Sequence, residues 1–137
     1  MKALAAALIL ALLPAASAAT LTIQVKNVAA KGGTLRVSLY DRDGWSKDDD
    51  SPVASANVPA LAPVTTVVLK DIKPGSYGVK LYQDANNNEK FDQNFLGIPL
   101  ERYGFSRDAK PFLSQPGFDR AKFDLAEPGA ELTIHLQ

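Results

Sequence analysis

Apolar and polar residues alternate in several short runs of this chain, and Gly, Pro, Asn and Asp residues separate one run from the next. Residues 21–26 read Leu-Thr-Ile-Gln-Val-Lys, and residues 35–40 read Leu-Arg-Val-Ser-Leu-Tyr. A repeat of two residues is typical of a β-strand that buries one face and exposes the other. We therefore predict two strands here, joined by a turn at Lys31-Gly32-Gly33.

The rest of the chain continues this rhythm. Further strands are predicted at residues 53–58, 64–69, 77–82, 118–125 and 132–136. Pro52 and Pro59 mark the first of these as an edge strand, because proline cannot donate a backbone hydrogen bond. No segment shows an amphipathic helical period over a dozen residues, and residues 105–118 are predicted to form a long loop. The predicted fold class is all-β: a single antiparallel β-sandwich of about seven strands, immunoglobulin-like or transthyretin-like.

The N-terminal residues predict a cleavable secretory signal. One lysine precedes an unbroken apolar run at residues 3–13, and Ala16-Ser17-Ala18 offers the small residues that a signal peptidase requires. The run is shorter than the roughly 20 residues that cross a bilayer. We expect residues 1–18 to be the signal peptide, with a cut after Ala19 as the alternative, and residues 19–137 to be the β-sandwich domain. The mature protein is then periplasmic or secreted, without a membrane anchor.

Charge and composition narrow the classes of function. The chain has 15 basic and 15 acidic residues, and removal of Lys2 with the signal peptide leaves a net charge of −1. Such a balance offers no electrostatic footprint for nucleic acid or for anionic lipid. A domain of this length buries a core without disulfides, and the absence of cysteine fits a periplasmic protein. We expect a monomer that does not bind nucleic acid.

Two motifs carry a resemblance to known families. Residues 69–79 read Leu-Lys-Asp-Ile-Lys-Pro-Gly-Ser-Tyr-Gly-Val, which resembles a hairpin of transthyretin-like and collagen-adhesin B-type modules. The more specific match is the block rich in Asp and Asn at residues 84–94, followed by Phe-Leu-Gly-Ile-Pro at 95–99 and Tyr-Gly-Phe-Ser at 103–106. Together these resemble domain-of-unknown-function family 2141, small exported bacterial proteins with a predicted β-sandwich. The resemblance covers nearly the entire mature chain and implies the fold, without an established activity.

The block at residues 84–94 has the spacing of a calcium-binding loop. Side-chain oxygens recur at alternate positions, as in the EF-hand loops that wrap Ca²⁺. The candidate metal ligands are Asp84, Asn86, Asn88, the backbone carbonyl of Lys90, and Asp92. Two positions depart from the pattern. Phe95 replaces the bidentate glutamate, and Glu89 replaces the glycine that the family's usual loop, Asp-x-Asn-x-Asn-Gly-x-x-Asp-x-Asn, also carries. We therefore predict a weak Ca²⁺ site, with a Kd on the order of 10⁻⁴ to 10⁻³ M.

The alternative for this loop is a turn without an ion. Asp and Asn side chains hydrogen-bond to their own backbone in Asx-turns, so an Asn-rich tip also forms a well-capped turn. In the calcium-binding alternative Asn88 is the residue able to adopt a left-handed backbone conformation in place of the missing glycine, because Asn tolerates positive φ.

A second candidate site follows the loop. Glu101, Arg102, Tyr103 and Phe105 are predicted to form a small surface for a ligand or an envelope protein, because aromatic residues and arginine are enriched at recognition sites. The alternative is that the aromatic side chains plug the open end of the sandwich.

Two further features are expected to have no functional role. The acidic residues at 41–45 and 48–50 are predicted to form a solvated loop, and strand parity places Asp41 and Asp84 at opposite ends of the sandwich. His135, the only histidine, is predicted to face solvent on the last strand without a partner.

These features favour a protein that is not an enzyme. The chain has no cysteine, no Gly-x-Ser-x-Gly motif and no histidine placed to act as a base. One hypothesis is a periplasmic binding or interaction module whose residues 84–112 meet a ligand or an envelope partner. The other is a structural accessory domain whose loop binds Ca²⁺ or caps the sheet. A small carboxylate-based hydrolase is the third and weakest alternative.

Overall fold

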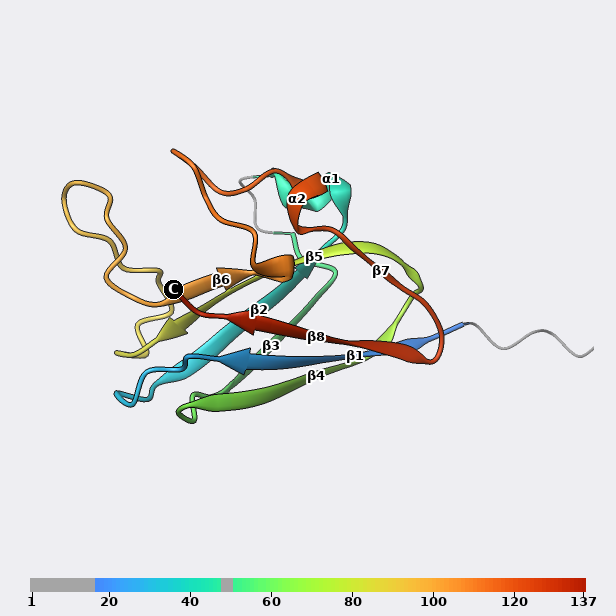
Figure 1. Ribbon diagram of the computed structural model, residues 1–137, viewed down its shortest axis with the longest axis horizontal. Coiled ribbons are helices and arrows are strands. Elements are labelled where there is room, and N and C mark those ends of the chain that lie inside the picture. Colours follow the sequence, from blue (N-terminus) through green and yellow to red (C-terminus); the bar gives the residue numbers. More distant parts are fainter. Residues whose placement is uncertain (1–16, 48–50) are drawn as a thin grey trace, which may run out of the picture.

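The computed structural model describes residues 17–47 and 51–137, which form two β-sheets packed face to face (Figure 1). The three-stranded sheet has the order β4-β1-β8. Its strands are β1 (Ala19–Lys26), β4 (Val64–Ile72) and β8 (Gly129–His135). The five-stranded sheet has the order β3-β2-β5-β6, and β7 pairs with another part of β5. Its strands are β2 (Thr34–Tyr40), β3 (Ala54–Pro59), β5 (Gly75–Asp84), β6 (Tyr103–Phe105) and β7 (Phe123–Leu125). The predicted all-β sandwich is confirmed, with eight strands.

The core lies between the two sheets and contains the inward side chains that the alternation predicts. Leu21, Ile23 and Val25 of β1 are fully buried, and Leu35 and Leu39 of β2 face them from the other sheet. On β5 the side chains of Tyr77, Val79 and Leu81 point into the core, as the alternation predicts. Lys80 and Tyr82 point to the outer face. The strand periodicity therefore sets both the core and the composition of the outer face.

One strand pair differs from the predicted antiparallel arrangement. β1 and β8 pair in parallel, from Thr20 opposite Gly129 to Lys26 opposite His135, whereas the other named strand pairs are antiparallel. The chain crosses between the sheets before β8, so the last strand enters beside the first in the same direction. The alternation of apolar and polar residues shows which face of a strand is buried, but it does not show the direction of the strand relative to its neighbour. The parallel pairing of β1 and β8 was therefore not predictable from the alternation.

The prediction of a strand over residues 118–125 is wrong at its start. Phe118–Ala121 form the short helix α2, and only Phe123–Leu125 form a strand. Phe118 and Ala121 are buried three residues apart, and the backbone N–H of Lys122 donates to the carbonyl of Phe118 at 2.8 Å. Both a helical turn and a strand place apolar residues at such short spacings, so a segment of this length is ambiguous. The predicted long loop at 105–118 also contains a 3₁₀ turn, η1 (Ser106–Asp108).

The prediction of a solvated loop at residues 41–45 is also wrong. Arg42–Trp45 form helix α1, capped by Asp41, whose side chain accepts a hydrogen bond from the N–H of Gly44 at 2.7 Å. Trp45 is buried in a second apolar cluster on the outer side of the five-stranded sheet, together with Phe118 of α2. Figure 1 shows α1 and α2 on this same side. The parity argument itself is confirmed, because β2 and β5 are antiparallel.

Some predictions concern residues that the structure does not describe. Residues 48–50 of the second acidic segment, and residues 1–16 of the predicted signal peptide, lie outside the described residues. β1 begins at Ala19. Within residues 17–47 and 51–137 no helix is both long and apolar enough to cross a membrane.

Candidate functional site

The outer face of the five-stranded sheet carries two cross-strand rows of side chains. The register of β2, β5 and β6 places three residues in each row. The first row is Arg36, Tyr82 and Tyr103, and the second is Ser38, Lys80 and Phe105. Neighbouring side chains on one face of a sheet lie close enough to form a common surface.

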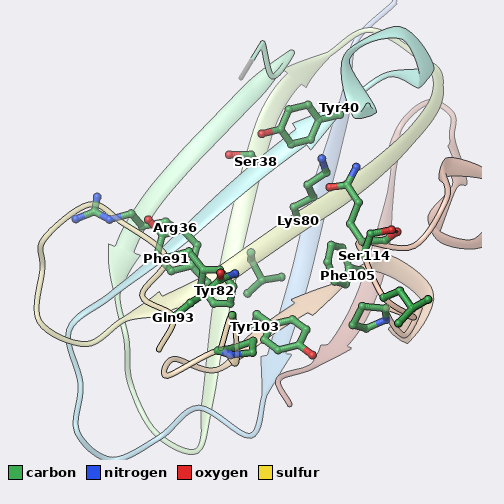
Figure 2. Close-up of a pocket in the computed structure, with 16 residues that line it drawn as sticks. Arg36, Ser38, Tyr40, Lys80, Tyr82, Phe91, Gln93, Tyr103, Phe105 and Ser114 are labelled. Carbon is green, nitrogen blue, oxygen red and sulfur yellow. The ribbon is translucent and has the colours of Figure 1, made fainter. Parts of the chain in front are cut away.

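Aromatic rings form a connected series over these rows. Phe91, from the loop after β5, packs on Tyr82 with ring centroids 5.5 Å apart and on Tyr103 at 5.7 Å. Tyr103 contacts Phe105 at 6.0 Å, and Phe105 contacts Trp45 at 6.2 Å. Figure 2 shows the side chains of Tyr82, Tyr103 and Phe105 on the sheet, with Phe91 beside Tyr82. The series crosses the face from the loop that contains Phe91 to helix α1.

Two loops turn this aromatic face into a groove of about 600 Å³. On one side the loop after β5 contributes Gln93, Gly97 and Pro99, and on the other side the segment before α2 contributes Leu113 and Gln115. The floor is made of the two rows described above. Ligand pockets in proteins have volumes of about 300–1,000 Å³, so the groove is large enough for a small molecule.

Helix α1 anchors one side of the groove. The indole N–H of Trp45 donates to the carbonyl of Pro116 at 2.9 Å, and the amide of Gln115 donates to the carbonyl of Trp45 at 3.0 Å. Lys80 Nζ donates to that carbonyl at 2.6 Å and lies 4.6 Å from the ring centroids of both Tyr40 and Trp45. These contacts attach the loop to the sheet through a buried tryptophan.

The predicted metal loop begins with a fully buried carboxylate. Asp84 Oδ2 accepts hydrogen bonds from Arg36 Nε at 2.7 Å and from the backbone N–H of Glu89 at 2.8 Å. Asp84 Oδ1 accepts from the N–H of Asn88 at 3.2 Å. Burial alone would raise the pKa of Asp84, but the bonds from Arg36, Glu89 and Asn88 hold this pKa below its ordinary value. The carboxylate closes the loop onto the sheet.

The exposed part of the loop is organised around Asp92. The side-chain amide of Asn86 donates to Asp92 Oδ2 at 2.9 Å, and that of Asn88 donates to Asp92 Oδ1 at 2.8 Å. The side-chain oxygen of Asn88 accepts from the N–H of Lys90 at 3.0 Å. These contacts are those of the capped turn, the alternative that the sequence left open. Within the described chain no three His, Cys, Asp or Glu side chains group as a metal site would, and Ca²⁺ binding stays a prediction.

The left-handed positions of this loop differ from the expectation. Asn87 has φ 54° and Glu89 has φ 63°, whereas Asn88 does not adopt positive φ. Glu89 is the residue that stands at the glycine of the family's usual loop. Glycine adopts positive φ without a steric penalty, so residue 89 has the backbone conformation that a glycine at this position would favour.

The four residues of the predicted recognition surface do not lie together. Tyr103 and Phe105 line the groove, but Glu101 is buried and accepts the N–H groups of Ala85 and Asp92, each at 2.9 Å. Arg102 reaches away from the groove and donates to the carbonyl of Asn27 at 2.8 Å. Glu101 and Arg102 therefore support the loop and the sheet edge. Tyr103 and Phe105 stand on the outer face of the five-stranded sheet and do not plug an open end of the sandwich. Their role in recognition stays a prediction.

Sequence reasoning missed most of the groove. Arg36, Ser38 and Lys80 were seen only as outward strand positions, and Phe91 lies within the supposed metal loop. The sequence did contain one sign of the groove. Aromatic residues occupy outward positions of strands that become neighbours, so strand pairing brings them together on one face.

His135 was also predicted to lack a partner, and this prediction is wrong. Its Nδ1 lies 2.8 Å from Asp108 Oδ2. Asp108 belongs to η1, far from β8 in sequence, so no local pattern could reveal the contact.

Comparisons with known proteins give one result. A family model described as "Uncharacterized protein conserved in bacteria (DUF2141)" matches residues 23–133. Neither a curated protein nor a solved structure matches the chain. The matched range runs from β1 into β8 and includes every element that builds the groove. The chain therefore belongs to the DUF2141 family of bacterial proteins.

Proposed function

We propose that this protein is an exported, non-enzymatic binding module whose ligand site is the groove on the outer face of the five-stranded sheet. The observation that carries the proposal is the groove itself, with its floor of aligned aromatic and polar side chains between two anchored loops. A rigid sheet that positions variable loops is a common basis for ligand binding. Export rests on the signal peptide that the sequence predicts.

The composition of the groove supports binding of a small molecule. Tyr82, Phe91 and Tyr103 present ring surface, and Ser38 and Gln93 supply hydrogen-bonding groups. Ligand sites typically combine apolar walls with a few polar groups that fix orientation. The hydroxyl of Tyr82 is protonated at neutral pH like that of an ordinary tyrosine, and burial and the nearby charge of Asp84 raise its pKa further. It is therefore a hydrogen-bond donor for a ligand.

The placement of His135 supports a binding role over catalysis. The imidazole and the backbone N–H of His135 both bond to Asp108, and neither residue lines the groove. With no cysteine in the chain, a nucleophile in the groove would need a base other than this histidine. A structural accessory domain is the alternative, in which the groove serves only as packing surface.

A fragment screen by protein-observed NMR tests the proposal. Small aromatic and polar fragments should shift backbone signals of Tyr82, Tyr103 and Phe105 more than those of the three-stranded sheet. Tyr103→Ala should abolish these shifts, and Val68→Ala on the exposed face of β4 is the matched control. If fragments shift no groove signal, or bind the Tyr103→Ala variant equally well, the groove is not the ligand site.

A further inference from the structure

The two loops that border the groove expose large apolar side chains to water. Phe95 and Leu113 are 96% and 97% exposed, and Phe112 is 80% exposed. The members of this apolar rim, all within the segments 93–99 and 111–115, are Phe95, Leu96, Ile98, Phe112 and Leu113. In the rest of the described chain the exposed large apolar residues are Val53, Leu61, Val64, Val68 and Leu100. The rim differs from these residues because both of its segments line one groove, and exposed apolar surface gathered at a groove indicates a binding site.

The backbone of the first loop directs these side chains outward. Asn94 Oδ1 accepts from the N–H of Leu96 at 2.9 Å and from that of Ile98 at 3.0 Å, and Asn94 N–H donates to the carbonyl of Ile98 at 2.9 Å. Gln93 and Pro99 form a β-bridge at the base of this turn. The exposure of the rim is therefore a property of an ordered turn, held by its own hydrogen bonds.

The second loop is held in a similar way. The N–H of Phe112 donates to the carbonyl of Ser114 at 3.1 Å, and Gln115 and Pro116 bond to Trp45 as described above. Leu113 lines the groove while its side chain remains almost wholly exposed. Leu113 of the second loop and Gly97 and Pro99 of the first thus line the groove, and the exposed apolar residues beside them in sequence border it.

We propose that the groove and its apolar rim bind one molecule of a single-chain amphiphile. The apolar chain lies on the rings of Tyr82, Phe91 and Tyr103 and passes between the two loops, where the rim covers it. The polar head group reaches the hydroxyl group of Ser38 at the floor and the side-chain amide of Gln93 at the border of the groove. A compact polar ligand would leave the rim in water, and the groove volume of about 600 Å³ suits one small molecule. This inference rests on the proposed function of the groove.

Ligands that differ in whether they carry an alkyl chain test this inference. Dodecanoate and dodecyl maltoside are titrated below their micelle concentrations, with acetate and maltose as the same head chemistry without the chain. Trp45, the only tryptophan, contacts Phe105 and reports binding by fluorescence, and calorimetry gives the affinity. Both dodecyl probes should bind, and neither acetate nor maltose should. Vesicles of phosphatidylethanolamine and phosphatidylglycerol test whether the protein binds a bilayer surface instead of a single amphiphile in solution.

Variants of the rim complete the test. The double variant Phe95→Ser with Leu113→Ser should weaken binding of both dodecyl probes by at least about tenfold, because it removes apolar contacts. Leu61→Ser with Val68→Ser removes exposed apolar side chains elsewhere and should leave the affinity unchanged. Equal binding of the rim variant, or binding to vesicles alone, would overturn the inference. Fragments that bind the groove while both dodecyl probes fail would overturn it and leave the proposed function standing.

Discussion

Gly78 of β5 lies directly beneath the indole of Trp45: a Cβ atom at residue 78 would stand 2.5 Å from Trp45 Cζ3. The absence of a side chain lets the tryptophan rest on the sheet, from which it contacts Tyr40, Phe105 and Phe118. The same tryptophan holds one loop of the groove. A small residue within a strand thus determines how a loop far away in the sequence is attached.

Gly78→Ala should lower the free energy of unfolding by about 1–3 kcal/mol, because the added methyl group forces Trp45 to move in a packed environment. The fluorescence of Trp45 should shift as well. Gly117→Ala is the matched control, since a Cβ atom at Gly117 would meet nothing within 4 Å and its φ of −64° suits alanine. Chemical denaturation followed by fluorescence and circular dichroism measures both. A Gly78→Ala protein as stable as the control would contradict the described packing.

Asp84 and Asp92 are both candidate metal ligands, yet their contributions to stability should differ. Asp84→Ala removes the buried acceptor of Arg36, Asn88 and Glu89 and should cost about 1–3 kcal/mol. Asp92→Ala removes exposed contacts only and should change the free energy of unfolding by less than about 0.5 kcal/mol. Urea denaturation without metal compares the two. Equal losses would show that the loop is not organised around Asp84.

The lowered pKa of Asp84 predicts the direction of a pH effect. A folded-state pKa below the unfolded value of about 3.9 means that the ionised carboxylate stabilises the fold above that pH. This stabilisation disappears as the pH falls through the folded pKa. The difference in unfolding free energy between wild type and Asp84→Asn should therefore be largest at neutral pH and shrink as the pH falls below the ordinary pKa of an aspartate, about 3.9. A difference that stays constant over this range would refute the assignment.

Glu89→Gly should stabilise the protein by about 0.5–1 kcal/mol, because glycine adopts the φ of 63° without the cost of a left-handed L-residue. Part of that gain is offset by the greater chain entropy of glycine. Glu131→Gly in strand β8, where the backbone is extended, is the matched control and should destabilise. Thermal melts of the wild type and the two variants give their order of stability directly. A Glu89→Gly variant that is less stable than the wild type would contradict the left-handed conformation of residue 89.

The predicted weak Ca²⁺ site has a clear thermodynamic signature. Ca²⁺ at about 100 times its Kd should add about 2.7 kcal/mol to the free energy of unfolding. Binding also requires the side chains of Asn86 and Asn88 to turn their oxygens, instead of their amide nitrogens, toward the ion. Melts with Ca²⁺ and with chelator should therefore differ for the wild type and coincide for Asp92→Ala. If the wild type melts at the same temperature with Ca²⁺ and with chelator, the loop is a capped turn that does not bind Ca²⁺.

The parts of the fold that alternation specifies were predictable. The inward residues of β1, β2 and β5 follow from a period of two, because each of these strands has one face in the core. Helices α1 and α2, with four residues each, are too short for a helical period to show. Strand β6, with three residues, is likewise too short for an alternating pattern.

The groove was harder to foresee because it depends on pairing between distant segments. Phe91 meets Tyr82 and Tyr103 only after the loop folds back over β5 and β6. The spacing of Asp and Asn in that loop pointed to a cation, whereas in the fold the first carboxylate bonds to Arg36 on another strand. Local spacing does not show which partner a buried charge obtains from elsewhere in the chain.

The parallel pairing of β1 with β8 has a consequence for biosynthesis. β1 obtains one of its two neighbours from residues 129–135, so the three-stranded sheet cannot close until these residues have been synthesised. Contacts this distant in sequence form slowly. Removal of residues 129–135 would leave β1 with an unpaired edge, because β8 is its parallel neighbour on that side.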